Sequence, residues 1–103
     1  MAVKSLENAK KYLSEKELFY ESLEKCITVF LVTKFDFKNT DLVSESINKK
    51  LSKIGVDKNT RDDLINILNT CQYFKFTPNS EFDTTNDYNK SVEIIMNLQN
   101  FKL

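Results

Sequence analysis

The sequence contains no histidine, one glycine and one proline in 103 residues. An all-β fold needs turn residues between its strands, whereas long helices need little glycine or proline. Eight phenylalanines and four tyrosines supply bulky side chains for one core, and a chain of this size buries about two-thirds of its unfolded surface. We therefore expect an all-α fold: a compact bundle of four to five helices in a single domain over residues 1–103, with 1–14 as a possible lead-in helix and 15–100 as the core bundle.

An excess of positive charge is also missing, because 15 lysines and arginines balance 15 aspartates and glutamates. Proteins that bind nucleic acid through its phosphates depend on such an excess, so we expect no nucleic-acid partner. The longest apolar run, Cys26 to Val32, is far shorter than the roughly 20 residues that span a bilayer, and the amino terminus has no signal-peptide hydrophobic stretch. We expect no membrane insertion by this segment itself.

The residue types that most catalytic and metal sites use are scarce. Without histidine the usual general base is absent, and no GxSxG motif or glycine-rich phosphate loop is present. Asp62 with Asp63, and Glu81 with Asp83, are acidic pairs of the kind that most often lie in solvent at a helix start or in a polar loop. We therefore expect no enzyme activity, no metal and no cofactor.

Cys26 and Cys71 form no CxxC motif and stand 45 positions apart. Both fall on apolar stripes, and an unpaired cysteine commonly behaves as a small buried hydrophobic residue. We expect two buried thiols and a reducing compartment, with a disulfide or a reactive thiol as the alternative.

Apolar residues that recur at three- and four-residue steps predict five helices. The predicted spans are about 3–13, a second helix from Ser14 to about Lys34, a third over 44–54, a fourth after a cap at Asn59 or Thr60, and a last one over about 85–100. The predicted inward faces are Leu6, Ala9, Lys10 and Leu13; Phe19, Leu23, Cys26, Ile27, Phe30 and Leu31; Ile47, Leu51 and Ile54; Leu64, Ile65, Leu68, Cys71 and Phe74; and Tyr88, Val92, Ile95 and Leu98 or Gln99.

Local signals at the helix ends refine this prediction. Ser14 and Glu17 have the spacing of a capping box, and Gly55 stands where a left-handed residue commonly ends a helix, with Val56 packing back on the last turn. Residues 35–40 predict an extended connector that presses one or both of its phenylalanine rings into the core. The β-branched run 26–32 leaves a strand as a minor alternative there.

The tract Tyr73-Phe74-Lys75-Phe76-Thr77-Pro78 crowds aromatic and basic residues at a helix end, before a proline turn and a loop over 79–86. One interpretation is structural: the aromatic rings close the base of the core while the Lys75 side chain extends outward. The other is a partner-binding surface made by Tyr73, Lys75, Phe76 and Pro78.

Four stretches of the sequence follow the pattern of a known family: Phe19 to Leu23, Cys26 to Lys34, Leu51 to Val56, and Leu68 to Pro78. Over about residues 5–99 the chain resembles the carboxy-terminal domain of the BatD family of the Bacteroides aerotolerance (Bat) system. It departs from the pattern inside the last stretch. Gln72 replaces a Glu, Phe74 an Ala, Lys75 an Arg and Thr77 an Ala.

This resemblance implies a cytoplasmic helical interaction domain of an inner-membrane oxygen- or stress-tolerance protein. Its implied partners are the other Bat-system proteins, which are of the von Willebrand factor A, tetratricopeptide-repeat and MoxR-type ATPase classes. One alternative is a structural cap that stabilises the adjacent membrane segment without partners. A thiol-based redox sensor built on Cys26 and Cys71 is the other.

Overall fold

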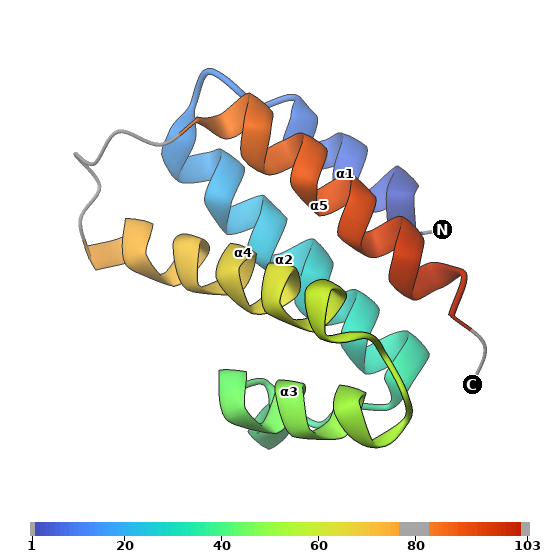
Figure 1. The fold of residues 1–103 in the computed structure, drawn as a ribbon. Helices are drawn as coiled ribbons and strands as arrows, with labels where there is room; N and C mark the ends of the chain where they lie inside the picture. The colour runs from blue at the N-terminus through green and yellow to red at the C-terminus, as the bar shows by residue number, and fades with distance from the viewer. Residues whose placement is uncertain (1, 77–82, 102–103) are drawn as a thin grey trace.

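A computed structural model describes residues 2–76 and 83–101, and gives side chains for residues 6–74 and 83–101. Its elements, in chain order, are α1 (Ala2–Lys10), α2 (Lys16–Phe35), a short 3-10 helix η1 (Asn39–Asp41), α3 (Ser44–Lys53), α4 (Lys58–Phe76) and α5 (Thr84–Gln99) (Figure 1). The described ranges contain helices and no strand, which confirms the all-α prediction and excludes the strand alternative for residues 26–32.

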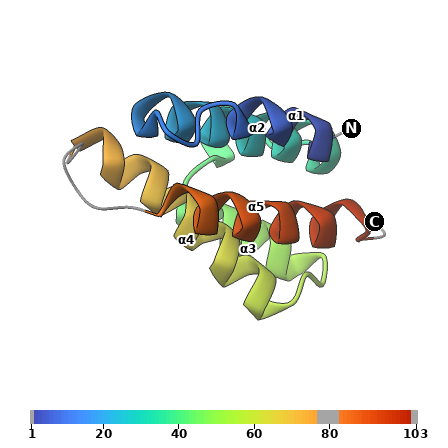
Figure 2. The same ribbon diagram turned by 90° about the horizontal axis from the view of Figure 1, so that it is seen from above.

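The helices form two layers. Helices α1 and α2 make up one layer, and α5 lies with α4 and α3 in the other (Figure 2). Contacts across the layers join α2 to both α4 and α5, and join α1 to α5. Two buried side chains of α1, Leu6 and Ala9, belong to this core, so the first helix is packed into the domain. Lys10 was predicted to lie on the same inward face, but it is exposed, so the prediction is wrong for this residue.

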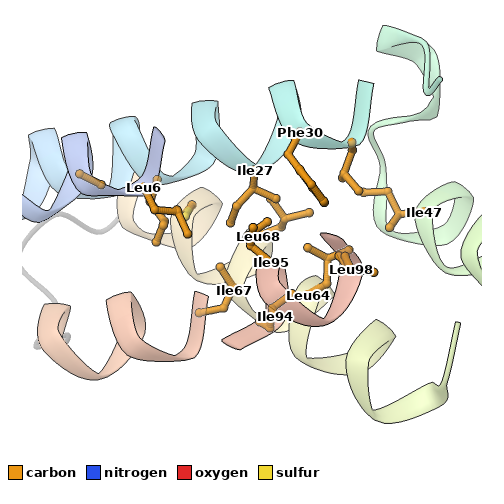
Figure 3. Close-up of a cluster of buried hydrophobic side chains, with 14 of the residues drawn as sticks. Leu6, Ile27, Phe30, Ile47, Leu64, Ile67, Leu68, Ile94, Ile95 and Leu98 are labelled. Carbon is orange, nitrogen blue, oxygen red and sulfur yellow. The ribbon is translucent and has the colours of Figure 1, made fainter. Parts of the chain in front are cut away.

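Helix α2 is the centre of the core. Its buried side chains recur at three- and four-residue steps, as predicted, and they are Phe19, Tyr20, Leu23, Ile27, Phe30 and Leu31. Figure 3 shows side chains from α1, α2, α4 and α5 meeting in one cluster, with Leu6, Ile27, Leu68 and Ile95 among them. A long helix that contacts three others buries a broad face, which is why Tyr20 is buried beside the predicted stripe.

The start of α2 corrects the predicted capping box. Helix α1 ends at Lys10, and the chain then turns, with the Tyr12 amide donating to the Ala9 carbonyl at 3.0 Å and the Glu15 amide donating to the Tyr12 carbonyl at 2.8 Å. The N-cap is therefore Glu15, and it makes no side-chain capping bond. Ser14 is still within the turn, one residue too early to cap the helix.

The turn from α3 to α4 follows the glycine prediction. Gly55 has φ of 99°, in the left-handed region, and the Val56 amide donates to the Leu51 carbonyl at 3.0 Å, so Val56 packs back and is buried. Ile54 was expected to be buried, but 42% of it is exposed, because the helix ends at Lys53 and Val56 takes the inward place.

The cap of α4 is neither Asn59 nor Thr60. Asp57 precedes the helix, and its carboxylate accepts from the Thr60 amide at 3.0 Å and from the Thr60 hydroxyl at 2.8 Å. These bonds lower the pKa of Asp57, with the amide bond as the largest cause. The predicted inward face of α4 is otherwise confirmed, with Ile65 only half-buried and Ile67 buried in addition.

Helix α5 starts one residue earlier than predicted, capped by Asp83, which accepts from the Asn86 amide at 3.0 Å. Its buried residues are Thr84, Ser91, Ile94, Ile95 and Leu98. The predicted face had Tyr88 and Val92, which are half-buried, and lacked Ser91 and Ile94. The buried face is broader than one stripe because α5 contacts α1, α2 and α4.

The connector after α2 buries Phe37 and half-buries Phe35, as predicted, and their ring centroids lie 6.2 Å apart. Asp36 between them adopts φ of 56° and ends the helix, with its amide donating to the Leu31 carbonyl. The connector is less extended than expected, since residues 39–41 form η1. Phe101, which follows α5, packs half-buried against the core.

One polar pair crosses the core. The Tyr20 hydroxyl donates to Asp87 Oδ2 at 2.5 Å, which links α2 to α5. Burial of the ring, together with this hydrogen bond, raises the pKa of Tyr20 far above its ordinary value of about 10. The phenol is therefore neutral and donating over the whole physiological range.

Leu23→Ala should lower the free energy of unfolding by about 2–5 kcal/mol, because it removes a fully buried side chain from the central helix. Val29→Ala on the same helix is the control, since Val29 is 55% exposed, and its loss should stay within about 0.5 kcal/mol. Urea unfolding measures both. Equal losses in the free energy of unfolding for the two variants would contradict the burial of Leu23.

Tyr20→Phe should cost about 1–3 kcal/mol at pH 8, because the half-buried Asp87 carboxylate loses the donor of this hydrogen bond. The pKa of Tyr20 is raised on folding, so its contribution is complete below the unfolded value of about 10 and is lost as the pH rises above it. The stability gap between the wild type and the variant should thus narrow from pH 10 to pH 11. If the difference in the free energy of unfolding between the wild type and the variant stays constant from pH 10 to pH 11, the phenol is not held neutral and donating in the folded protein.

Candidate functional site

The tract predicted to bind a partner divides between the core and the surface. Tyr73 is 56% exposed on α4, whereas Phe74 is buried with its ring centroid 5.0 Å from that of Tyr20. Lys75 and Phe76 belong to the last turn of α4, but their side chains, like Pro78, lie outside the described residues. The structural interpretation therefore holds for Phe74, and the docking interpretation is compatible with Tyr73.

The surroundings of Tyr73 are polar. A shallow hollow beside its ring is lined by Asn66, Asn69 and Thr70 of the same helix. The Thr70 hydroxyl donates to the Asn66 carbonyl, and Asn69 accepts from Ser44 of α3. Tyr73 is thus an exposed aromatic residue on a polar helix face, and single exposed apolar groups of this kind are ordinary on protein surfaces.

A larger depression runs between α1 and α2. This groove has a volume of about 680 Å³ and ends at the carboxyl end of α5. Its lining residues are Asn8, Lys11 and Tyr12 at the α1 side, Ser22, Lys25, Cys26, Val29, Phe30, Thr33 and Lys34 of α2, and Gln99 of α5. Pockets that bind ligands are typically about 300–1,000 Å³ and mostly apolar with a few polar groups, so the groove is of a suitable size.

An exposed apolar stripe accompanies the groove on α2. Leu18, Val29 and Val32 are 45%, 55% and 40% exposed. With Lys25 they stand at relative positions i, i+7, i+11 and i+14, which places them on one face of the helix. The other large exposed apolar residues, Val43, Ile54, Tyr73 and Met96, are distributed over several elements. The α2 stripe is therefore the one apolar face of the described surface that runs along a single helix.

The charge at the groove is positive. Lys11, Lys25 and Lys34 line it, and no acid is among its described lining residues. Among the acids of these two helices, Glu24 accepts from Gln72 of α4 at 2.8 Å, and Glu21 is exposed on α2 one helical turn before Lys25.

Lys34 and Gln99 lie where the groove meets the carboxyl end of α5. Lys34 Nζ donates to the Gln99 backbone carbonyl at 2.8 Å and lies 5.9 Å from the centroid of the Phe35 ring. The Gln99 side-chain oxygen, Oε1, is buried and accepts no hydrogen bond. A buried acceptor without a donor is uncommon and costs free energy.

The two cysteines differ from the prediction that both are buried. Cys71 is 1% exposed in the core, whereas Cys26 is half-buried because it lines the groove. Neither is in a disulfide. Burial raises the pKa of the Cys26 thiol, which lowers its thiolate fraction at neutral pH. This thiol is thus accessible but weakly nucleophilic.

The sequence held a signal for this groove that the core prediction did not use. The run Cys26 to Val32 contains six apolar residues over two helical turns, and a helix in contact with neighbours on one side cannot bury two consecutive turns completely. Ile27, Phe30 and Leu31 face the core, so Val29 and Val32 face outward.

No three side chains of the metal-binding types gather within residues 6–74 and 83–101. In the part of the chain that the structure describes, no helix combines the length and the apolar character needed to cross a bilayer. Comparison of the chain with protein-family models, curated proteins and solved structures finds no match. The resemblance to BatD therefore stays a prediction.

Cys26 should react with N-ethylmaleimide in the folded protein at least about tenfold faster than Cys71, because only Cys26 lines an open groove and buried sites react through opening of the structure. Mass spectrometry of digested samples distinguishes the two sites. In denaturing urea the two rates should converge, which is the control. Equal rates in the folded protein would contradict the difference in burial.

Proposed function

We propose that this domain is a protein-interaction module without catalytic activity of its own. Its binding surface is the layer of α1 and α2, where the groove and the α2 stripe lie side by side. The observation that carries the proposal is the exposure of Leu18, Val29 and Val32 along one helix face. Apolar residues exposed along one helix face have a solvation cost that a partner removes on binding, and here they alternate with the polar Ser22 and Lys25 between Leu18 and Val29.

The resemblance to BatD supplies the setting of this proposal. In that setting the module lies on the cytoplasmic side of an inner-membrane protein and docks Bat-system partners of the von Willebrand factor A, tetratricopeptide-repeat or MoxR-type ATPase classes. The balanced charge and the scarcity of catalytic residue types support a docking role.

The thiol-sensor alternative has less support. Cys71 lies in the core at 1% exposure, so its sulfur is not open to an oxidant. Burial raises the pKa of Cys26, whereas a sensor thiol has a lowered pKa. The structural cap makes a different prediction from the interaction module, since it requires no partner at the α2 stripe.

Binding of the purified domain to purified proteins of the three Bat classes tests the proposal. Val29→Glu should weaken binding by about tenfold or more, because it places a charge in an apolar contact. Val43→Glu is the matched control, since Val43 is 56% exposed and lies before α3. Isothermal titration calorimetry measures each affinity, and circular dichroism confirms that each variant is folded.

Lys75→Glu separates the two candidate surfaces in the same assay. The α2 surface predicts that this variant binds as tightly as the wild type. A loss with Lys75→Glu and none with Val29→Glu would transfer the interface to the Tyr73–Pro78 tract. No binding by the wild-type domain to any of the three classes would leave the structural cap as the better account.

A further inference from the structure

We infer that the groove between α1 and α2 binds an amphipathic helix whose apolar face is flanked by acidic residues. This inference rests on the proposed function for the existence of a protein partner, and it adds the chemistry and shape of the segment that docks. Three features of the described surface lead to it: its shape, its length and its charge.

The shape of the surface fits a helix. Two packed helices present a groove into which the side-chain ridge of a third helix fits, and helix-in-groove binding is a common mode of peptide recognition. The groove floor includes Cys26, Val29 and Phe30 of α2, and Tyr12 stands at the opposite side. Small and medium apolar side chains of a docked helix would cover these groups.

The length of the stripe favours a helix over a compact small molecule. Leu18 and Val32 are fourteen positions apart on α2, which at 1.5 Å per residue is about 21 Å. Leu18, an exposed apolar residue of this face, lies beyond the groove, whose α2 residues begin at Ser22, and Ser22 and Lys25 stand between Leu18 and Val29. A helix of about four turns covers such a face, whereas a ligand confined to the groove leaves Leu18 in water.

The charge selects the partner. Lys11 and Lys25 are exposed, line the groove, and form no ion pair within the described part of the chain. Glu24 hydrogen-bonds to Gln72 of α4, and no acid is among the described lining residues of the groove, so the lining itself is positively charged. Glutamates or aspartates beside the apolar face of a docked helix would pair with these lysines, and lysines there would be repelled.

Two designed peptides of 16 residues test the inference with the whole chain. Both carry leucine at positions i, i+4, i+7 and i+11 of a helix, and one has glutamate, the other lysine, at the flanking positions. Fluorescence anisotropy measures the affinity, and protection of Cys26 from N-ethylmaleimide reports whether the groove is covered. The glutamate peptide should bind at least about tenfold more tightly than the lysine peptide and should slow Cys26 labelling.

Charge reversal supplies the matched variants. Lys11→Glu with Lys25→Glu should reverse the preference, so that the lysine peptide binds more tightly. Lys53→Glu with Lys58→Glu changes the net charge equally at two exposed sites at the α3–α4 turn and should keep the preference for the glutamate peptide. All four lysines are exposed, and circular dichroism verifies that both variants fold.

Three outcomes would overturn the inference: equal affinity for the two peptides, peptide binding that leaves Cys26 labelling unchanged, or protection of Cys26 by dodecanoate without protection by the glutamate peptide. The last result would assign the groove to a small anionic amphiphile. Failure of the inference is distinguishable from failure of the proposed function. If Bat-class proteins bind equally well to the wild type and to Val29→Glu, the groove is not their binding site, but the domain is still an interaction module. If the glutamate peptide binds and no Bat-class protein does, the groove binds a helix and the proposed Bat partners are wrong.

Discussion

The fold depends on the burial of α2 against three other helices. Its buried residues contact α1 in the same layer and α4 and α5 in the other, so this helix holds the two layers together (Figure 2). The apolar area that Phe19, Leu23, Ile27 and Leu31 remove from water is the main favourable contribution at this junction. One side of α2 has no neighbour across from it, and the candidate interaction surface lies there. One face of this twenty-residue helix therefore packs in the core, and a different face is the proposed binding surface.

The central helix also shows how far sequence periodicity predicts structure. The inward stripes of α2 and α4 were predicted because apolar residues repeat at helical spacing, and burial confirms them for most residues. The N-caps of the helices were harder to predict. Ser14 and Asn59 have suitable side chains, but the observed N-caps depend on where the preceding turn ends, which is set by backbone hydrogen bonds such as that from Glu15 to Tyr12. The face of α5 was partly missed because three neighbours broaden it, and the spacing within one helix does not reveal the number of its neighbours.

The candidate site was less predictable than the fold. Tyr73 attracted attention because it lies in an aromatic and basic tract, yet its neighbours on α4 are polar. The groove is formed by residues of α1, α2 and α5 that lie far apart in sequence, and its lysines look like ordinary solvated residues until these helices are packed. Only the apolar run 26–32 was visible in advance, and the distinction between its inward and outward members depends on the position of α1 and α4 around α2.

The hydrogen bonds between the first and last thirds of the chain have a consequence for synthesis. Tyr20 bonds to Asp87, Lys34 to Gln99, and Thr84 to the Leu13 carbonyl, across separations of 67, 65 and 71 residues. A nascent chain on the ribosome has α1 and α2 available long before α5 emerges, and the apolar face of α2 then has no helix from the carboxyl end to cover it. Completion of the core therefore waits until α5 has emerged, and until then the side chains of α2 that α5 covers are exposed to solvent.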